Sequence, residues 1–219
     1  MSSTPAREAI LTRLAAACRT PAPVPAPADI WDAPELDAPK RLELLAKRLQ
    51  AVRTEVHVTP EKQWKAKLAE LLAARKPATL AHGTGAWFAK DLPGICKKPG
   101  MPALTPYYED VDQFKDALFG VEASITTARA GIAETGALLL TPDAGEPRLL
   151  SLVPPVHFVV LRARDIAASF AGAIRDLKLA EAMPANLVLI SGPSKTADIE
   201  LTLTFGVHGP KELIALILT

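Results

Sequence analysis

The sequence has only two cysteines and no long apolar run. These features argue against a disulfide-rich protein and a membrane-spanning protein, respectively. Its 219 residues include two cysteines, Cys18 and Cys96, far apart along the chain. This spacing excludes a disulfide framework and a Cys-x-x-Cys metal site, and it fits a reducing cytoplasm. No run of about 18 apolar residues is present, so the sequence predicts no membrane span. Glu8 and Arg13 interrupt the apolar stretch near the N-terminus, which does not fit a signal peptide.

An excess of charge of either sign is also absent. The chain has 25 basic and 24 acidic residues and a formal net charge of +1. Nucleic-acid-binding proteins normally carry a marked basic excess, so this class is excluded. The four histidines lie far apart, and no His-x-x-x-His or paired-carboxylate spacing occurs. We therefore expect no metal site and no cofactor, and a purified protein that is colourless.

The composition predicts one α/β domain with an N-terminal appendage. Hydrophobic residues make up 49% of the chain, enough for a large core. Residues 5–18 have the pattern of a short amphipathic helix, and residues 20–39 contain six prolines, which predicts a semi-extended linker. We expect residues 1–39 to form an arm that is separable from a body at residues 40–219. The arm is expected to contact a second subunit, in a homo-oligomer, or a partner protein.

From residue 40 onward the pattern alternates between helix and strand. Apolar runs at residues 78–81, 156–161, 186–190 and 213–218 predict strands, and amphipathic segments between them predict helices. Such alternation is typical of βαβ crossovers, so we predict a mostly parallel sheet flanked by helices. Turn residues between short apolar segments at residues 124–152 predict an inserted antiparallel hairpin.

The segment 191–200 carries the most specific polar pattern in the chain. It follows the apolar run at residues 186–190, and Gly192 and Pro193 end that strand. Thr196 is placed to cap a helix over residues 196–205. A loop from a strand into a helix presents backbone N–H groups to an anion, although a capped turn without a ligand has the same pattern. The predicted ligand-binding residues are Ser191, Gly192, Ser194, Lys195, Thr196 and, from a later loop, Gly209.

Other loops carry candidate acid–base residues. Glu134 lies between two glycines beside apolar segments, where burial would raise its pKa and make it an acid, a base or a nucleophile. Alternatively, its carboxylate accepts backbone N–H groups and fixes the turn. His208 lies in a glycine-rich connection and is either a surface group or a site residue that titrates near neutral pH. We predict Glu134 and His208 as catalytic residues in one pocket with the anion-binding loop, at the carboxyl ends of the strands. The segment 82–85 also follows a strand and is either a phosphate-binding turn or an ordinary one.

Three blocks, in order, resemble a known family. They are residues 131–136 (GIAETG), 191–200 (SGPSKTADIE) and 206–210 (GVHGP), and residues 149–161 fit as well. Together they resemble the lactate-utilisation protein C family (LutC/YkgG, the LUD domain) over roughly residues 40–219. Residues 1–39 resemble nothing in that family.

The resemblance implies both a fold and a role. The fold would be similar to the ribose-phosphate isomerase, glucosamine-phosphate deaminase and CoA-transferase group. The role would be in an L-lactate utilisation system that oxidises lactate to pyruvate, in which partner proteins carry iron–sulfur clusters. Because two isolated cysteines cannot hold such a cluster, this chain would be a cytoplasmic, non-redox accessory or substrate-binding subunit for a small anionic metabolite. The alternatives are a stand-alone enzyme that uses Glu134 on an acyl-CoA or phosphorylated metabolite, and a ligand sensor without catalysis.

Overall fold

The computed structural model describes residues 4–17, 35–107, 117–197, 203–206 and 208–219. It divides into two units, Met1–Asp32 and Ala33–Thr219. The described part of the first unit is one helix, α1 (Thr4–Ala17), which confirms the helix expected near residues 5–18. Its larger apolar side chains, Ile10, Leu11 and Leu14, are exposed.

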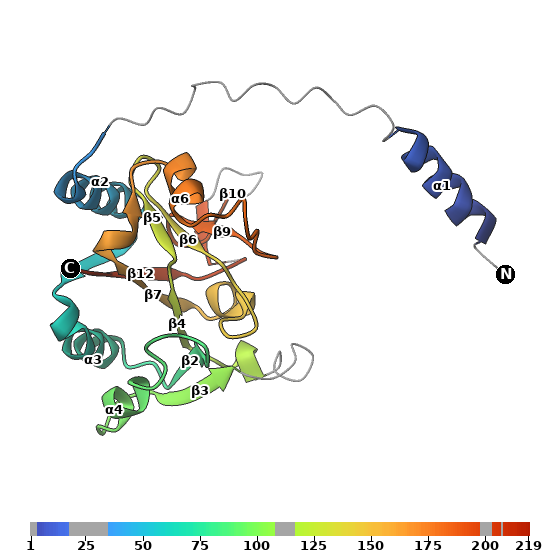
Figure 1. Cartoon of the computed structure of the whole chain (residues 1–219). Helices are drawn as coiled ribbons and strands as arrows, with labels where there is room; N and C mark the ends of the chain where they lie inside the picture. Colours follow the sequence, from blue (N-terminus) through green and yellow to red (C-terminus); the bar gives the residue numbers. More distant parts are fainter. Residues whose placement is uncertain (1–3, 18–34, 108–116, 198–202, 207) are drawn as a thin grey trace. The chain divides into compact units, whose positions relative to one another are not determined.

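The second unit is built on a six-stranded parallel sheet with the order β1-β12-β7-β4-β2-β3 (Figure 1). All neighbouring strands in it are parallel. Apart from His157, the buried residues of the central strands β7 and β12 are apolar, as a parallel sheet covered on both faces requires. The predicted α/β class is therefore confirmed. The strands are β1 (Glu55–Thr59), β2 (Thr79–Gly83), β3 (Ala103–Tyr107), β4 (Ala123–Thr127), β7 (Val156–Arg162) and β12 (Glu212–Leu218).

Helices cover both faces of this sheet. On one face, α3 (Trp64–Arg75) and α4 (Leu92–Cys96) share a core with the sheet that includes Leu68 and Phe158. On the other face, α2 (Ala38–Ala51) buries Leu45 against Val159. Phe158 and Val159 point to opposite faces because side chains alternate along a strand. None of the described helices is long and apolar enough to cross a membrane.

A smaller sheet has the order β8-β5-β6-β9. Its strands are β5 (Ala130–Ile132), β6 (Ala137–Leu140), β8 (Ile166–Ala167) and β9 (Val188–Ile190), and α6 (Phe170–Asp176) packs beside it. β5 and β6 form the predicted antiparallel hairpin, but the predicted boundaries were too wide. β4 belongs to the parallel sheet, because its residues 123–126 are buried and pair with β2 and β7. Residues Arg148–Ser151 form a 3-10 turn, as do Glu61–Gln63 and Ala163–Asp165.

The strand expected at residues 186–190 lies in the smaller sheet, so its predicted place in the parallel sheet was wrong. The observed strand, β9, has three residues and pairs antiparallel with β6. Leu189 is 47% exposed, whereas a central strand of a parallel sheet is buried on both faces. β9 is therefore suited to the edge position that it occupies.

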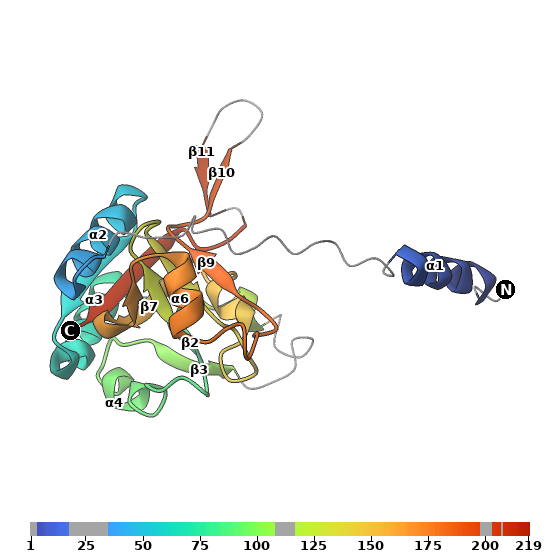
Figure 2. The ribbon, with the colours of Figure 1, turned by 45° about the horizontal axis from the view of Figure 1, so that its top comes forward.

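The helix predicted over residues 196–205 is also wrong. The described part of this segment is an antiparallel pair, β10 (Lys195–Ala197) and β11 (Leu203–Phe205). Figure 2 shows the two strands side by side, standing out from the two sheets. Residues 201–205 alternate leucine or phenylalanine with threonine, a period-two pattern of residues that favour strands. Thr196 is thus a strand residue and not a helix cap.

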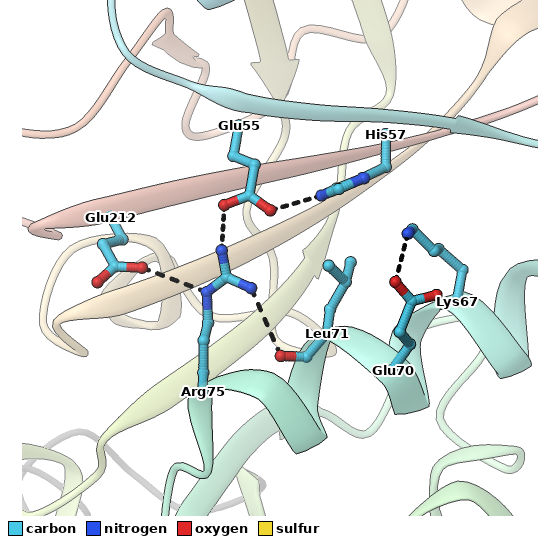
Figure 3. Close-up of polar contacts among 7 residues, drawn as sticks. All are labelled: Glu55, His57, Lys67, Glu70, Leu71, Arg75 and Glu212. Carbon is cyan, nitrogen blue, oxygen red and sulfur yellow. Dashed lines mark hydrogen bonds and ion pairs between the residues drawn. The ribbon is translucent and has the colours of Figure 1, made fainter.

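A polar cluster ties β1, β12 and α3 together at the amino edge of the parallel sheet (Figure 3). Arg75 pairs with Glu55 and, at 3.2 Å from Nε, with Glu212 Oε2. His57 Nε2 lies 2.6 Å from Glu55 Oε1. Burial raises the pKa of the Glu55 carboxyl, but the hydrogen bond with His57 and the charge of Arg75 outweigh this effect and hold the pKa below its usual value. The charges of this cluster are matched within the fold, which indicates a structural role.

Candidate functional site

A cavity of about 490 Å³ lies at the carboxyl ends of β2 and β4. Ligands of open α/β sheets bind at this edge, and the volume is within the usual range for small-molecule sites. The wall is partly polar, with Thr126, Thr127, Arg129, Asp143, Glu146 and Ser151, and partly apolar, with Trp87, Leu140, Pro142, Pro147, Leu177, Leu179, Ala182 and Pro184.

The loop that carries the two acidic side chains is held against the end of β2. The Gly85 N–H donates to Gly145 O at 2.9 Å. A Cβ on Gly83 would lie 2.3 Å from Gly145 O, so the close approach requires glycine there. Asp143 Oδ1 accepts from the backbone N–H groups of Gly145, at 2.7 Å, and Glu146, at 2.8 Å. The loop therefore has a fixed conformation on this wall.

Glu146 is the titratable group that the cavity perturbs most. Its Oε1 accepts the Thr127 N–H at 2.9 Å. Burial raises the pKa of Glu146, with a smaller contribution from the nearby Asp143 charge, and this outweighs the hydrogen bonds from Thr127, which lower it. The raised pKa favours the protonated carboxyl group, which is able to donate as well as accept a hydrogen bond.

The hydroxyl group of Thr126, on the same wall, lies within hydrogen-bond distance of a buried histidine. Thr126 Oγ1 lies 2.8 Å from His157 Nε2. His157 is fully buried in β7, and this burial lowers its pKa to about 3, so the ring is neutral near pH 7. Its Nδ1 has no hydrogen-bond partner among the described residues. His157 thus supports a cavity residue from within β7.

Two further cavity residues differ in how they are paired. The Trp87 ring stacks with Arg162, whose guanidinium carbon lies 4.3 Å from the ring centroid, and makes an edge contact with Trp64. Arg162 is also paired with Glu61.

Arg129 is exposed, and within the described part of the chain it forms no ion pair. It is therefore a cation available to a ligand.

The predicted anion loop lies at the opposite, amino edge of the parallel sheet. Ser191 O accepts from Thr54, just before β1, and the Ser194 N–H donates to Pro210 O, just before β12, both at 2.8 Å. A Cβ on Gly192 would lie 2.7 Å from Val52 O. The expectation that this loop is at the carboxyl ends of parallel strands was therefore wrong. The structure brings it beside the connection that contains His208 and Gly209, and Lys195 and His208 are exposed.

Glu134 lies elsewhere, in the turn between β5 and β6. Its backbone N–H donates to Ala168 O at 3.0 Å, and the turn packs on α2, where a Cβ on Gly136 would be 2.4 Å from Arg48 Cβ. The hairpin register puts this turn at the end remote from Arg129 and Leu140, which line the cavity. No hydrogen bond or ion pair between described residues joins Glu134 to residues 191–195 or 208–209, so the single shared pocket stays a prediction.

Sequence reasoning missed Thr126, Arg129 and Glu146. Residues 142–146 were interpreted only as a turn, and β4 was assigned to the hairpin. Had β4 been placed in the parallel sheet, the threonines at its end and the nearby arginine would have marked this edge. Within the described residues, no group of three or more His, Cys, Asp or Glu side chains is placed to hold a metal ion.

Comparison with known proteins identifies the family. The LUD domain family matches residues 42–218. The uncharacterized protein NMB1437 of Neisseria meningitidis serogroup B is 35% identical over 222 residues, covering 96% of this chain and 92% of that protein. Lactate utilization protein C of Halalkalibacterium halodurans is 34% identical over 93 residues, which span 41% of this chain and 40% of that protein.

A solved structure has the same fold. The crystal structure of a DUF162 family protein from Deinococcus radiodurans superposes with a TM-score of 0.61 and 19% sequence identity, covering 84% of this chain and all of that chain. At this identity the likeness concerns the fold alone. The family match spans most of the chain and coincides with the body built on the parallel sheet. This chain belongs to the LUD domain family.

Proposed function

We propose that this chain is a component of an L-lactate utilisation system and acts there as a non-redox subunit that binds a small anionic ligand. The observation that carries the proposal is membership of the LUD family together with a relative named lactate utilization protein C. The cavity at the carboxyl edge supports a ligand-binding role. It combines Arg129, which forms no ion pair with another described residue, with Glu146, whose pKa is raised by burial.

The non-redox role follows from what the sequence contains. Lactate oxidation removes two electrons, and iron–sulfur clusters are held by several cysteine thiolates. The chain has two cysteines, and burial raises the pKa of the Cys96 thiol, which disfavours the thiolate that ligates metals. Electron transfer would therefore belong to iron–sulfur partner proteins. The alternative, in which Glu134 attacks an acyl-CoA or phosphorylated metabolite, is favoured by no observation on the described residues.

A growth experiment tests this role. A deletion strain of the source organism should fail to grow on L-lactate and should grow normally on pyruvate, because only the step before pyruvate is lost. Wild-type protein supplied from a plasmid should restore growth on L-lactate. Normal growth of the deletion strain on L-lactate, with no second copy of the gene present, would contradict the proposal.

A further inference from the structure

We propose that the carboxyl-edge cavity binds a small organic monocarboxylate, with Arg129 pairing with the carboxylate and Thr126 and Glu146 donating hydrogen bonds to its oxygen atoms. This assignment rests on the ligand-binding role proposed above and specifies the ligand class and the site. The site differs from the loop at residues 191–196, which lies at the other edge of the sheet.

The described wall of the cavity has one cationic side chain, which can pair with one negative charge on a ligand. Arg129 is the only cationic side chain among the lining residues that the structure describes, and Asp143 and Glu146 are the two acidic ones. A carboxylate satisfies the guanidinium by a charge-assisted, often bidentate, hydrogen-bond pair. A phosphate dianion or an acyl-CoA would bring a second charge or more toward the two carboxyl groups, and like charges in a partly buried site repel strongly.

The buried histidine makes Thr126 a donor to the ligand. His157 is neutral, so one ring nitrogen carries a proton and the other is an acceptor. An unpaired buried N–H group is rarer in proteins than an unpaired acceptor, so the proton belongs on Nε2 and the unpaired Nδ1 is the acceptor. Thr126 Oγ1 then accepts from Nε2, and its own hydroxyl proton is available to an acceptor in the cavity.

Glu146 adds a second donor that depends on pH. One of its oxygens accepts from Thr127, which leaves the other free to carry the proton. The other charged groups that line the cavity are Asp143, which disfavours ionisation of Glu146, and Arg129, which is paired with neither. Protonated Glu146 donates to a ligand oxygen, whereas ionised Glu146 repels the ligand carboxylate. Binding should therefore weaken as the pH rises.

The apolar part of the wall suits the remainder of such a ligand. Leu140, Leu177 and Leu179 lie in the wall with several prolines. A short carbon chain buries favourably there, at roughly 25 cal/mol per Å² of apolar surface. The described wall thus combines one cationic side chain with apolar surface, as a monocarboxylic acid combines one carboxylate with a carbon chain.

Calorimetric titration of the full chain tests the assignment, with L-lactate, pyruvate, butyrate and inorganic phosphate as probes. At least one monocarboxylate should bind, and more tightly than phosphate. Arg129→Gln should weaken that binding by about tenfold or more, because a charge-assisted pair is lost. Arg164→Gln is the matched control, since Arg164 is exposed and outside the cavity, and it should bind as the wild type does. Thermal unfolding of both variants should match that of the wild type.

A second variant tests the role of Glu146 separately from that of Arg129. Glu146→Gln keeps an acceptor for Thr127 and a permanent donor, so its affinity should change less with pH than that of the wild type, which should weaken as the pH rises. Equal affinities of the wild type and Arg129→Gln, tighter binding of phosphate, or no binding of any of the three acids would overturn the assignment. Loss of growth on L-lactate in the deletion strain together with any of these results would leave the proposed function standing and the site wrong. Cavity binding without a growth defect would leave the site assignment standing and would contradict the proposed role in lactate utilisation.

Discussion

Lowering the pH from about 6.5 to about 4.5 is expected to remove roughly 2 kcal/mol from the free energy of unfolding through His157 alone. Burial in β7 lowers the pKa of His157 to about 3 from an ordinary value of 6.5. In the unfolded chain the imidazole takes up a proton below about 6.5, while in the fold it stays neutral. Protonation therefore favours the unfolded state increasingly as the pH falls from 6.5 toward 3, at about 1.4 kcal/mol per pH unit.

Urea unfolding at a series of pH values measures this effect, with a substitution that removes the titrating group. His157→Gln retains a polar partner for Thr126 and has no proton to gain, so its stability should fall less steeply by about 1.4 kcal/mol per pH unit between pH 6 and 4.5. Equal slopes for the wild type and His157→Gln would show that His157 is protonated in the fold.

Gly83→Ala is expected to displace the loop that carries Asp143 and Glu146. The added Cβ would lie 2.3 Å from Gly145 O and 2.8 Å from Glu146 Cα, and both of these are backbone atoms that cannot rotate away. We expect a loss of roughly 1–3 kcal/mol in the free energy of unfolding, as for other overpacked sites. Carboxylate binding should fall by about tenfold or more, because Glu146 moves with its backbone.

Gly94→Ala is the control for this substitution. Gly94 lies in α4, and a Cβ there would meet nothing within 4 Å. Alanine favours a helix over glycine by about 0.5–1 kcal/mol, so this variant should be as stable as the wild type or slightly more stable, with unchanged binding. If Gly83→Ala behaved like Gly94→Ala in both measurements, the close approach of the two loops would have no part in shaping the cavity.

The parallel core was predictable from sequence, and the partners of its shorter strands were not. Residues 213–218 are a continuous apolar run and residues 156–161 are apolar except for His157, and only a strand covered on both faces accommodates such runs. Residues 186–190 are also apolar, but the run does not specify its neighbour, and β9 pairs with β6 in the smaller sheet. At residues 194–205, a serine, a threonine and nearby acids are common to helix starts and to turns, and the period-two alternation at residues 201–205 was the better guide.

The cavity was harder to predict because its polar groups come from separate segments. Thr126 lies at the end of β4 and Arg129 just after it, whereas Asp143 and Glu146 belong to a turn after β6. They meet only because Gly83 and Gly85 admit the later loop close to the end of β2. The predicted residues in the loop at 191–195 and at 208–209 do lie together, since hydrogen bonds link Ser194 to Pro210 and to Gly206. The sequence had placed these loops at the carboxyl ends of the strands, whereas they lie at the amino edge, beside Thr54 and Pro210.

Complementation of the deletion strain by cavity variants tests most directly whether this LUD protein serves lactate utilisation through the carboxyl-edge cavity. Strains that carry Arg129→Gln or Arg164→Gln at equal protein levels are compared on L-lactate and on pyruvate. We predict that Arg164→Gln restores growth on L-lactate, that Arg129→Gln does not, and that both strains grow on pyruvate. Growth of the Arg129→Gln strain on L-lactate at the wild-type rate would contradict the account.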